Sequence, residues 1–263
     1  EISACLVGSE MCIRDRVISN LVTALTAGLA VSALPVVAES YARGDREKTQ
    51  RSVQMVLRIT AICCIPAGLG ISALSQEICQ LFFGYSSEVA IGAPLLRVLA
   101  VASIFIALTA AINSLLQAVG QVSLPVKLIV IGSLVKIMMN YVLVGIPQIN
   151  IQAAPWSTLC CYLLITVLSL ISLRHSVGEL GAVSVFLKPG FAGVLCAVFA
   201  RLSQNLLSTV TASRLSVLLS VAVGAAVYLA VLILLRAFQK EDILMLPKGE
   251  KIAKILEKYS LLG

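Results

Sequence analysis

The chain has 263 residues, of which 59% are hydrophobic and 13% are charged, and its mean hydropathy is +1.00. This composition contains more apolar surface than one water-soluble core can bury, so it excludes an ordinary soluble domain. The formal charge of +7 would fit a nucleic-acid-binding protein. The basic residues gather in connections between apolar runs, however, which favours a membrane protein with no nucleic-acid partner.

Seven apolar segments follow one another along the chain, and each is long enough for a membrane-spanning helix of about 20 residues. The runs are continuously apolar instead of alternating, which excludes a transmembrane β-barrel. The sequence therefore predicts an all-α polytopic helix bundle. The predicted segments are Val17–Ala38, Val53–Ser75, Gly92–Gln117, Leu124–Ile146, Ala153–Leu173, Leu187–Leu207 and Arg214–Arg236.

Basic residues alternate between the two sides of the predicted bundle. The connections after the first and fifth segments and the tail after the seventh contain Lys and Arg, whereas those after the second and fourth contain none. By the positive-inside rule, the first segment enters from outside and the C-terminus is cytoplasmic. The basic residues are Arg43, Arg46, Lys48, Arg51, Arg174, Lys188, Lys240, Lys248, Lys251, Lys254 and Lys258.

The two ends of the chain differ from the transmembrane lobe, which we place at residues 17–238. Residues 1–16 lack the features of a signal peptide and resemble a translated sequencing adaptor, so we expect them to be non-native and the natural chain to extend further upstream. In residues 239–263, apolar and lysine residues recur at helical spacing, which predicts an amphipathic helix on the inner membrane surface. A solvated, partly helical tail is the alternative.

Lys136 lies about halfway along the fourth segment, where an ammonium costs on the order of 3 kcal/mol or more. Such residues usually face a bundle interior or an aqueous cavity. Helical spacing places Gly132, Ser133 and Asn140 on the same face as Lys136. We therefore predict that Lys136, Asn140 and Ser133 line a substrate cavity.

Further polar residues in the apolar segments extend this predicted site. Asn113 and Gln117 share a stripe of the third segment with Ser103 and Thr109, although such groups often only bond neighbouring helices. Arg201 in the sixth segment either pairs with Gln204 or faces a cavity. Asn113, Gln117 and Arg201 complete the set of candidate substrate-binding residues. Near the ends of their segments, Arg58 and Arg97 are interpreted as snorkelling to the headgroups.

No pattern in the sequence predicts enzymatic chemistry, a metal site or a cofactor. All 13 acidic residues lie outside the apolar segments or at their edges, so this chain supplies no carboxylate at membrane depth for ion coupling. A cavity with cations and no carboxylates favours an anionic ligand. The lone His175 has no second ligand at metal-binding spacing, and no nucleotide-binding motif is present.

Five stretches of the chain resemble a known family: LPVVAESYARGDREKTQRSV (34–53), IPAGLGISALSQEICQLFFG (65–84), INSLLQAVGQVSLPVK (112–127), GSLVKIMMNYVLV (132–144) and LPKGEKIAKILEKYSLLG (246–263). In their order and spacing they are similar to the polysaccharide biosynthesis and export proteins of the multidrug/oligosaccharidyl-lipid/polysaccharide flippase superfamily, closest to stage V sporulation protein B. The chain departs slightly at INIQAAP, where the family usually has a glycine.

This resemblance implies a fourteen-helix protein of two lobes around a central cavity, in which the seven segments form the C-terminal lobe. It implies a flippase that moves lipid-linked oligosaccharide or peptidoglycan precursors, carried on a polyprenyl pyrophosphate, across a bacterial cytoplasmic membrane by alternating access. Its partners would be that substrate, membrane lipids and the missing N-terminal lobe. The alternatives are a multidrug exporter of the same superfamily and a non-transporting scaffold for envelope synthesis.

Overall fold

The computed structural model describes residues 35–83, 87–144, 152–207 and 213–235, and within these ranges every regular element is a helix. Residues 35–42 are helical and lead through a short turn into the first labelled helix. The labelled helices are α2 (Arg46–Ala73), α3 (Ser75–Phe83), α4 (Ser87–Ala118), α5 (Ser123–Val144), α6 (Ala153–Val177), α7 (Ala182–Leu207) and α8 (Ser213–Leu234). The predicted all-α architecture is confirmed.

Six of these helices are long and apolar enough to cross a membrane: α2, α4, α5, α6, α7 and α8. They correspond to the second to seventh predicted segments. Of the first predicted span, Val17–Ala38, only the part from residue 35 onward is described. Residues 1–16, which we expect to be non-native, and the predicted amphipathic tail at 239–263 lie outside the described residues.

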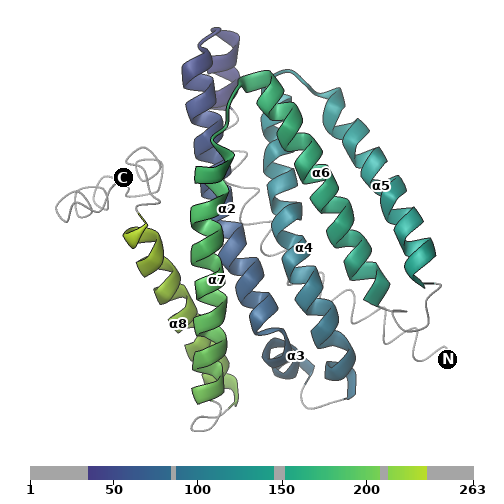
Figure 1. Ribbon diagram of the computed structural model, residues 1–263, viewed down its shortest axis with the longest axis vertical. Coiled ribbons are helices and arrows are strands. Elements are labelled where there is room, and N and C mark those ends of the chain that lie inside the picture. The colour runs from purple at the N-terminus through teal and green to yellow at the C-terminus, as the bar shows by residue number, and fades with distance from the viewer. Residues whose placement is uncertain (1–34, 84–86, 145–151, 208–212, 236–263) are drawn as a thin grey trace.

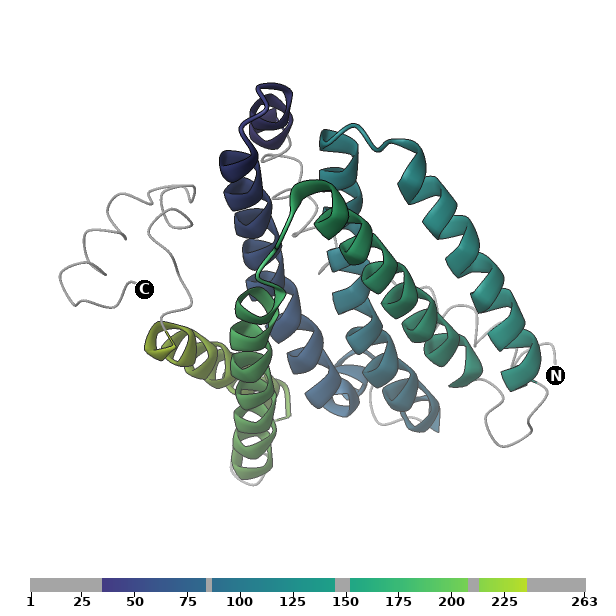
Figure 2. The ribbon, with the colours of Figure 1, turned by 45° about the horizontal axis from the view of Figure 1, so that its top comes forward.

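The long helices form an open row instead of a closed bundle. Helix α5 packs on α6, α6 on α4, α4 on α2, α2 on α7, and α7 on α8, while the short α3 packs on α4. Figures 1 and 2 show this order from both viewing directions, with α5 at one edge and α8 at the other. The edge helices have few neighbours, so much of their apolar surface is exposed.

The helix ends follow local signals in the sequence. Helix α2 begins about two turns earlier than predicted. The Asp45 side chain caps it there, accepting a hydrogen bond from the Lys48 N–H at 3.0 Å. Gly120 ends the turn after α4 with a φ of 85°, and the Gln121 N–H donates to the Leu116 carbonyl at 2.9 Å. A glycine in the left-handed region is a common way to end a helix, because it lacks the Cβ that would be strained there.

The short helix α3 was not predicted. Its sequence, SQEICQLFF, is too short and too polar for a membrane span, and it lies in the connection between the second and third predicted segments. Cys79 is buried in a cluster with Val89, Ala93 and Leu96 of α4, so α3 folds back against the start of α4. Burial of its apolar face explains why this connection is helical.

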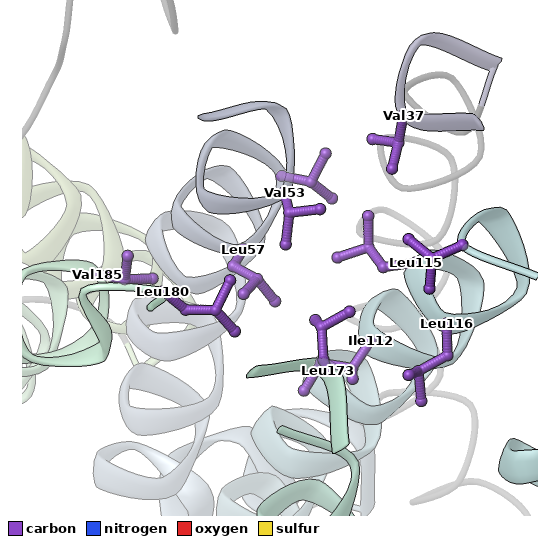
Figure 3. Packing of buried hydrophobic residues seen from close by; sticks show 11 residues of the cluster. Val37, Val53, Leu57, Ile112, Leu115, Leu116, Leu173, Leu180 and Val185 are labelled. Carbon is purple, nitrogen blue, oxygen red and sulfur yellow. The ribbon is translucent and has the colours of Figure 1, made fainter. Parts of the chain in front are cut away.

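The largest buried apolar cluster lies at the end of the bundle where α2 begins and where α4 and α6 end. It joins the helical segment 35–42, α2, α4, α6 and the α6–α7 connection, through residues such as Val37, Leu57, Ile112, Leu173 and Leu180. Figure 3 shows these side chains pointing toward one another. In Figure 1 the same end holds the start of α2 and the α4–α5 and α6–α7 connections. The start of α2 and the helix ends around the α6–α7 connection carry basic residues that predicted a cytoplasmic side, whereas the α4–α5 connection at 119–122 carries none.

Close helix contact depends on small residues at the interfaces. A Cβ atom at Gly68 would lie 2.3 Å from Ile104 Cγ1 and 2.7 Å from the Ala100 carbonyl, so glycine is required where α2 meets α4. A Cβ atom at Gly132 would lie 2.4 Å from Ile165 Cδ1, which imposes the same requirement where α5 meets α6.

Candidate functional site

Of the four residues predicted to share the polar face of α5, two contact α6: Gly132 and Asn140. The Cys161 thiol donates to the Gly132 carbonyl at 3.1 Å, and the Ser157 hydroxyl donates to Asn140 Oδ1 at 2.6 Å. Asn140 therefore has a partner within this chain. The contact also explains the glycine at position 132, since any side chain there would collide with α6.

Lys136 lies between these two contacts, four residues from each. Its side chain is half-buried. Ser133, three residues before Lys136 in the same helix, is exposed. Lys136 thus lies at the border between the α5–α6 contact and the open surface of α5.

The remaining surface of α5 is apolar and open. It presents a continuous set of large hydrophobic side chains that no described helix covers, because α5 is the edge helix of the row. These residues are Val126, Ile129, Val130, Ile131, Leu134, Ile137, Met138, Tyr141 and Val142. Within this surface, Ser133 and Lys136 are the polar positions in the middle of the helix.

The polar stripe predicted on α4 divides into parts with different surroundings. Thr109 Oγ1 lies 2.9 Å from Thr166 Oγ1 of α6, and Ser103 bonds its own helix at the Ala100 carbonyl. The Oδ1 atom of Asn113 is buried and has no hydrogen-bond partner among the described residues, whereas Gln117 is exposed near the end of the helix. Asn113 is therefore the member of this stripe with an unmet hydrogen-bonding requirement.

Arg201 pairs with Glu77, an acidic residue that is not among the predicted site residues. Its Nη1 atom donates to Glu77 Oε1 at 2.6 Å and to the Ala73 carbonyl at 3.3 Å, which ties α7 to the junction of α2 and α3. The predicted pairing with Gln204 is wrong, because Gln204 is buried between α7 and α8 and bonds Ser216 and Ser220. Glu77 offsets the charge of Arg201, so Arg201 is a weaker anion-binding candidate than Lys136.

Arg58 also differs from its interpretation. Only 8% of this residue is exposed, so its guanidinium is buried in the bundle instead of snorkelling to the headgroups. Thr166 and Ser169 of α6 were missed entirely. Both are buried on the face toward α4, and Ser169 has no partner for its hydroxyl among the described residues. Their spacing of three residues in an apolar segment was the available signal.

Two comparisons relate this chain to known proteins. The family model for lipid II flippase MurJ matches residues 15–176, which is more than half of the chain. A solved structure described as lipid II flippase MurJ in an inward closed conformation superposes with a TM-score of 0.56 at 18% identity. That match covers 86% of this chain and 50% of the solved chain, so this chain spans about half the length of that flippase.

No curated protein gives a match. At 18% identity, the structural likeness establishes the shared fold. The extent of the family match establishes more: the chain belongs to the lipid II flippase MurJ family.

Proposed function

We propose that this chain forms one lobe of a flippase that moves a lipid-linked peptidoglycan precursor across the cytoplasmic membrane of a bacterium. The observation that carries the proposal is the family match over residues 15–176. The six candidate spans and the likeness to half of a solved lipid II flippase support it. The mechanism would be alternating access, in which two lobes rock around a central site.

Lys136 is the proposed contact for the pyrophosphate of the substrate. Its ammonium lies halfway along α5, at the border of the exposed surface, and no described ion pair neutralises it. In a low-dielectric cavity a single cation attracts a doubly charged pyrophosphate strongly. Ser133 beside it can donate a hydrogen bond, while Asn140 holds α5 in register with α6 through Ser157.

Asn113, Gln117 and Arg201 complete the proposed substrate path with lesser roles. The unpartnered Oδ1 of Asn113 can accept a hydrogen bond from a sugar hydroxyl. Gln117 lies at the end where we propose that a substrate enters from the cytoplasm. Arg201 would act at the opposite end, where its charge is already shared with Glu77.

The second lobe would come from an N-terminal half of the same protein. The solved flippase is about twice the length of the matched region, and the apolar surface of α5 is uncovered at the edge of the row. We propose that the second lobe faces the Lys136 side of α5 and that lipid covers the rest. The basic helix ends favour a cytoplasmic C-terminus.

A closer relationship to stage V sporulation protein B is also part of this proposal. It rests on the five quoted stretches of sequence, and it would assign the flippase to spore-cortex peptidoglycan. Deletion of the gene should then impair cortex formation more than vegetative growth. Normal spores with defective vegetative walls would contradict that assignment and leave the flippase activity itself untouched.

The decisive experiment reconstitutes the full-length protein in vesicles with a fluorescent lipid-linked precursor. Lys136→Glu should abolish translocation because it replaces the proposed pyrophosphate contact with a repulsive charge. Lys127→Glu is the matched control: it reverses the charge of an exposed lysine near the start of the same helix. Equal activity of the two variants would refute the assignment of Lys136.

The same vesicles separate the alternative functions. Export of cationic dyes without movement of the precursor would indicate a multidrug exporter. Absence of both activities in the correctly inserted wild-type protein would indicate a scaffold for envelope synthesis.

A further inference from the structure

A pocket at the end of the bundle that we propose faces the cytoplasm is lined by none of the proposed substrate-binding residues. Its volume is about 320 Å³, and it lies between the turn that precedes α2 and the last turn of α6. At about 30 Å³ for each liquid water molecule, this space equals about ten waters. The lining residues are Tyr41, Gly44, Arg46, Thr49, Ser176 and Val177.

Arg46 provides the positive charge of this pocket. The neighbouring arginines are already paired: Arg43 with Glu39, Arg51 with Glu47, and Arg174 with Glu179. Among the described residues no acidic side chain forms an ion pair with Arg46. Its guanidinium is therefore available for an anionic ligand.

Asp45 is the acidic residue next to the pocket in sequence, but its carboxylate has a structural role. Its Oδ1 atom accepts the Lys48 N–H and caps α2. A ligand anion would therefore have to bind on the Arg46 side of the pocket, away from this carboxylate. The geometry consequently favours one localised anionic group over an extended polyanion.

The aliphatic hydroxyl groups of Thr49 and Ser176 act as acceptors toward the pocket. Thr49 Oγ1 donates its hydrogen to the Asp45 carbonyl at 2.8 Å. Ser176 Oγ donates its hydrogen to the Ser172 carbonyl at 3.0 Å. Ser176 Oγ also accepts a hydrogen bond from Gln121 Nε2 at 2.7 Å. A hydroxyl has one hydrogen and two lone pairs, so Thr49 can offer a ligand two lone pairs and Ser176 can offer one.

The donor and acceptor pattern defines the chemistry of the ligand. An anionic group would bind the Arg46 guanidinium, and hydroxyl groups of the same ligand would donate to Thr49 and Ser176. Tyr41 and Val177 supply an apolar wall. Tyr41 is 44% exposed, as is typical of a tyrosine at the membrane–water interface.

We propose that this pocket binds a polyol phosphate, which is either the headgroup of an inner-leaflet phospholipid such as phosphatidylglycerol or a soluble sugar or glycerol phosphate. The two sources share one phosphate and free hydroxyl donors. Binding would hold the turn before α2 against the end of α6 and so stabilise the cytoplasmic end of the lobe. This site is independent of the proposed flippase activity.

Native mass spectrometry of the delipidated full-length protein tests the proposal. The probes are phosphatidylglycerol, phosphatidylmethanol with the same acyl chains and charge but no hydroxyl groups, and glycerol 1-phosphate. Arg46→Ala should weaken phosphatidylglycerol binding about tenfold, as expected for loss of a charge-assisted hydrogen bond. Arg51→Ala removes the same charge from the same helix outside the pocket, and it should leave binding within about twofold of wild type.

The hydroxyl contacts need a separate comparison. Wild-type protein should prefer phosphatidylglycerol to phosphatidylmethanol, and Thr49→Val should remove that preference while the protein remains folded by its melting temperature. Competition by glycerol 1-phosphate would assign the soluble ligand, and its absence would assign the lipid headgroup. Equal binding by the Arg46→Ala and Arg51→Ala variants, or no preference for hydroxyl-bearing probes in wild type, would overturn the proposal.

Discussion

Replacing Arg201 should destabilise the protein more than replacing Glu77, because water reaches the two side chains to different extents. The Glu77 side chain is 14% exposed and its Oε2 atom already lacks a partner, whereas the Arg201 side chain is 39% exposed. Arg201→Met leaves a mostly buried carboxylate without its cation. Glu77→Gln leaves an arginine that water can still solvate and that keeps its bond to the Ala73 carbonyl.

The expected magnitudes follow from that exposure. Breaking a fully buried ion pair costs about 3–5 kcal/mol, and the partial exposure of Arg201 reduces our expectation for Arg201→Met to about 1–3 kcal/mol of unfolding free energy. Glu77→Gln should cost roughly 1 kcal/mol or less. The double variant should be less destabilised than the sum of the single variants, with a coupling energy of about 1 kcal/mol.

Unfolding by sodium dodecyl sulfate in mixed micelles, followed by far-ultraviolet circular dichroism, measures these differences. Arg97→Met is the control, since Arg97 is an exposed arginine of α4 with no ion pair among the described residues. It should change the free energy of unfolding by less than about 0.5 kcal/mol. Additive single variants, or a larger cost for Glu77→Gln than for Arg201→Met, would refute the reasoning.

Two further predictions concern the interfaces of α6. Gly132→Val should destabilise the protein by about 1–3 kcal/mol, since its Cβ would lie 2.4 Å from an Ile165 side-chain atom. Gly190→Val is the control, because nothing lies within 4 Å of the added Cβ. Equal melting temperatures for the two variants would contradict the close approach of α5 and α6. Thr109→Val removes the hydrogen bond to Thr166 and should cost about 0.6–1.7 kcal/mol. A Thr109→Val variant as stable as wild type in the same detergent titration would show that this bond contributes nothing.

The spans were predictable because the length and apolar composition of each segment determine them. Six predicted segments reappear as α2 and α4–α8, and the basic connections gather at one end of the row. Helix α3 escaped prediction because its nine residues form a helix through packing on α4, and that contact has no local signature.

The partners of the polar side chains were largely beyond prediction. Arg201 and Glu77 are 124 residues apart in the sequence, and Thr109 and Thr166 are 57 apart. Periodicity gives the face of each helix but not the neighbour that this face meets. The Lys136 stripe illustrates the limit: its members share a face as predicted, yet Asn140 and Gly132 of that face contact α6.

Cysteine accessibility measures most directly whether Lys136 faces an aqueous cavity. Lys136→Cys in a full-length protein without other cysteines would be exposed to a charged, water-soluble thiol reagent in vesicles, beside Met138→Cys on the exposed apolar surface of α5. We predict that position 136 reacts readily, that lipid-linked precursor slows its reaction, and that position 138 stays unreactive. A position 136 that does not react, or that reacts at the same rate with and without precursor, would contradict the account.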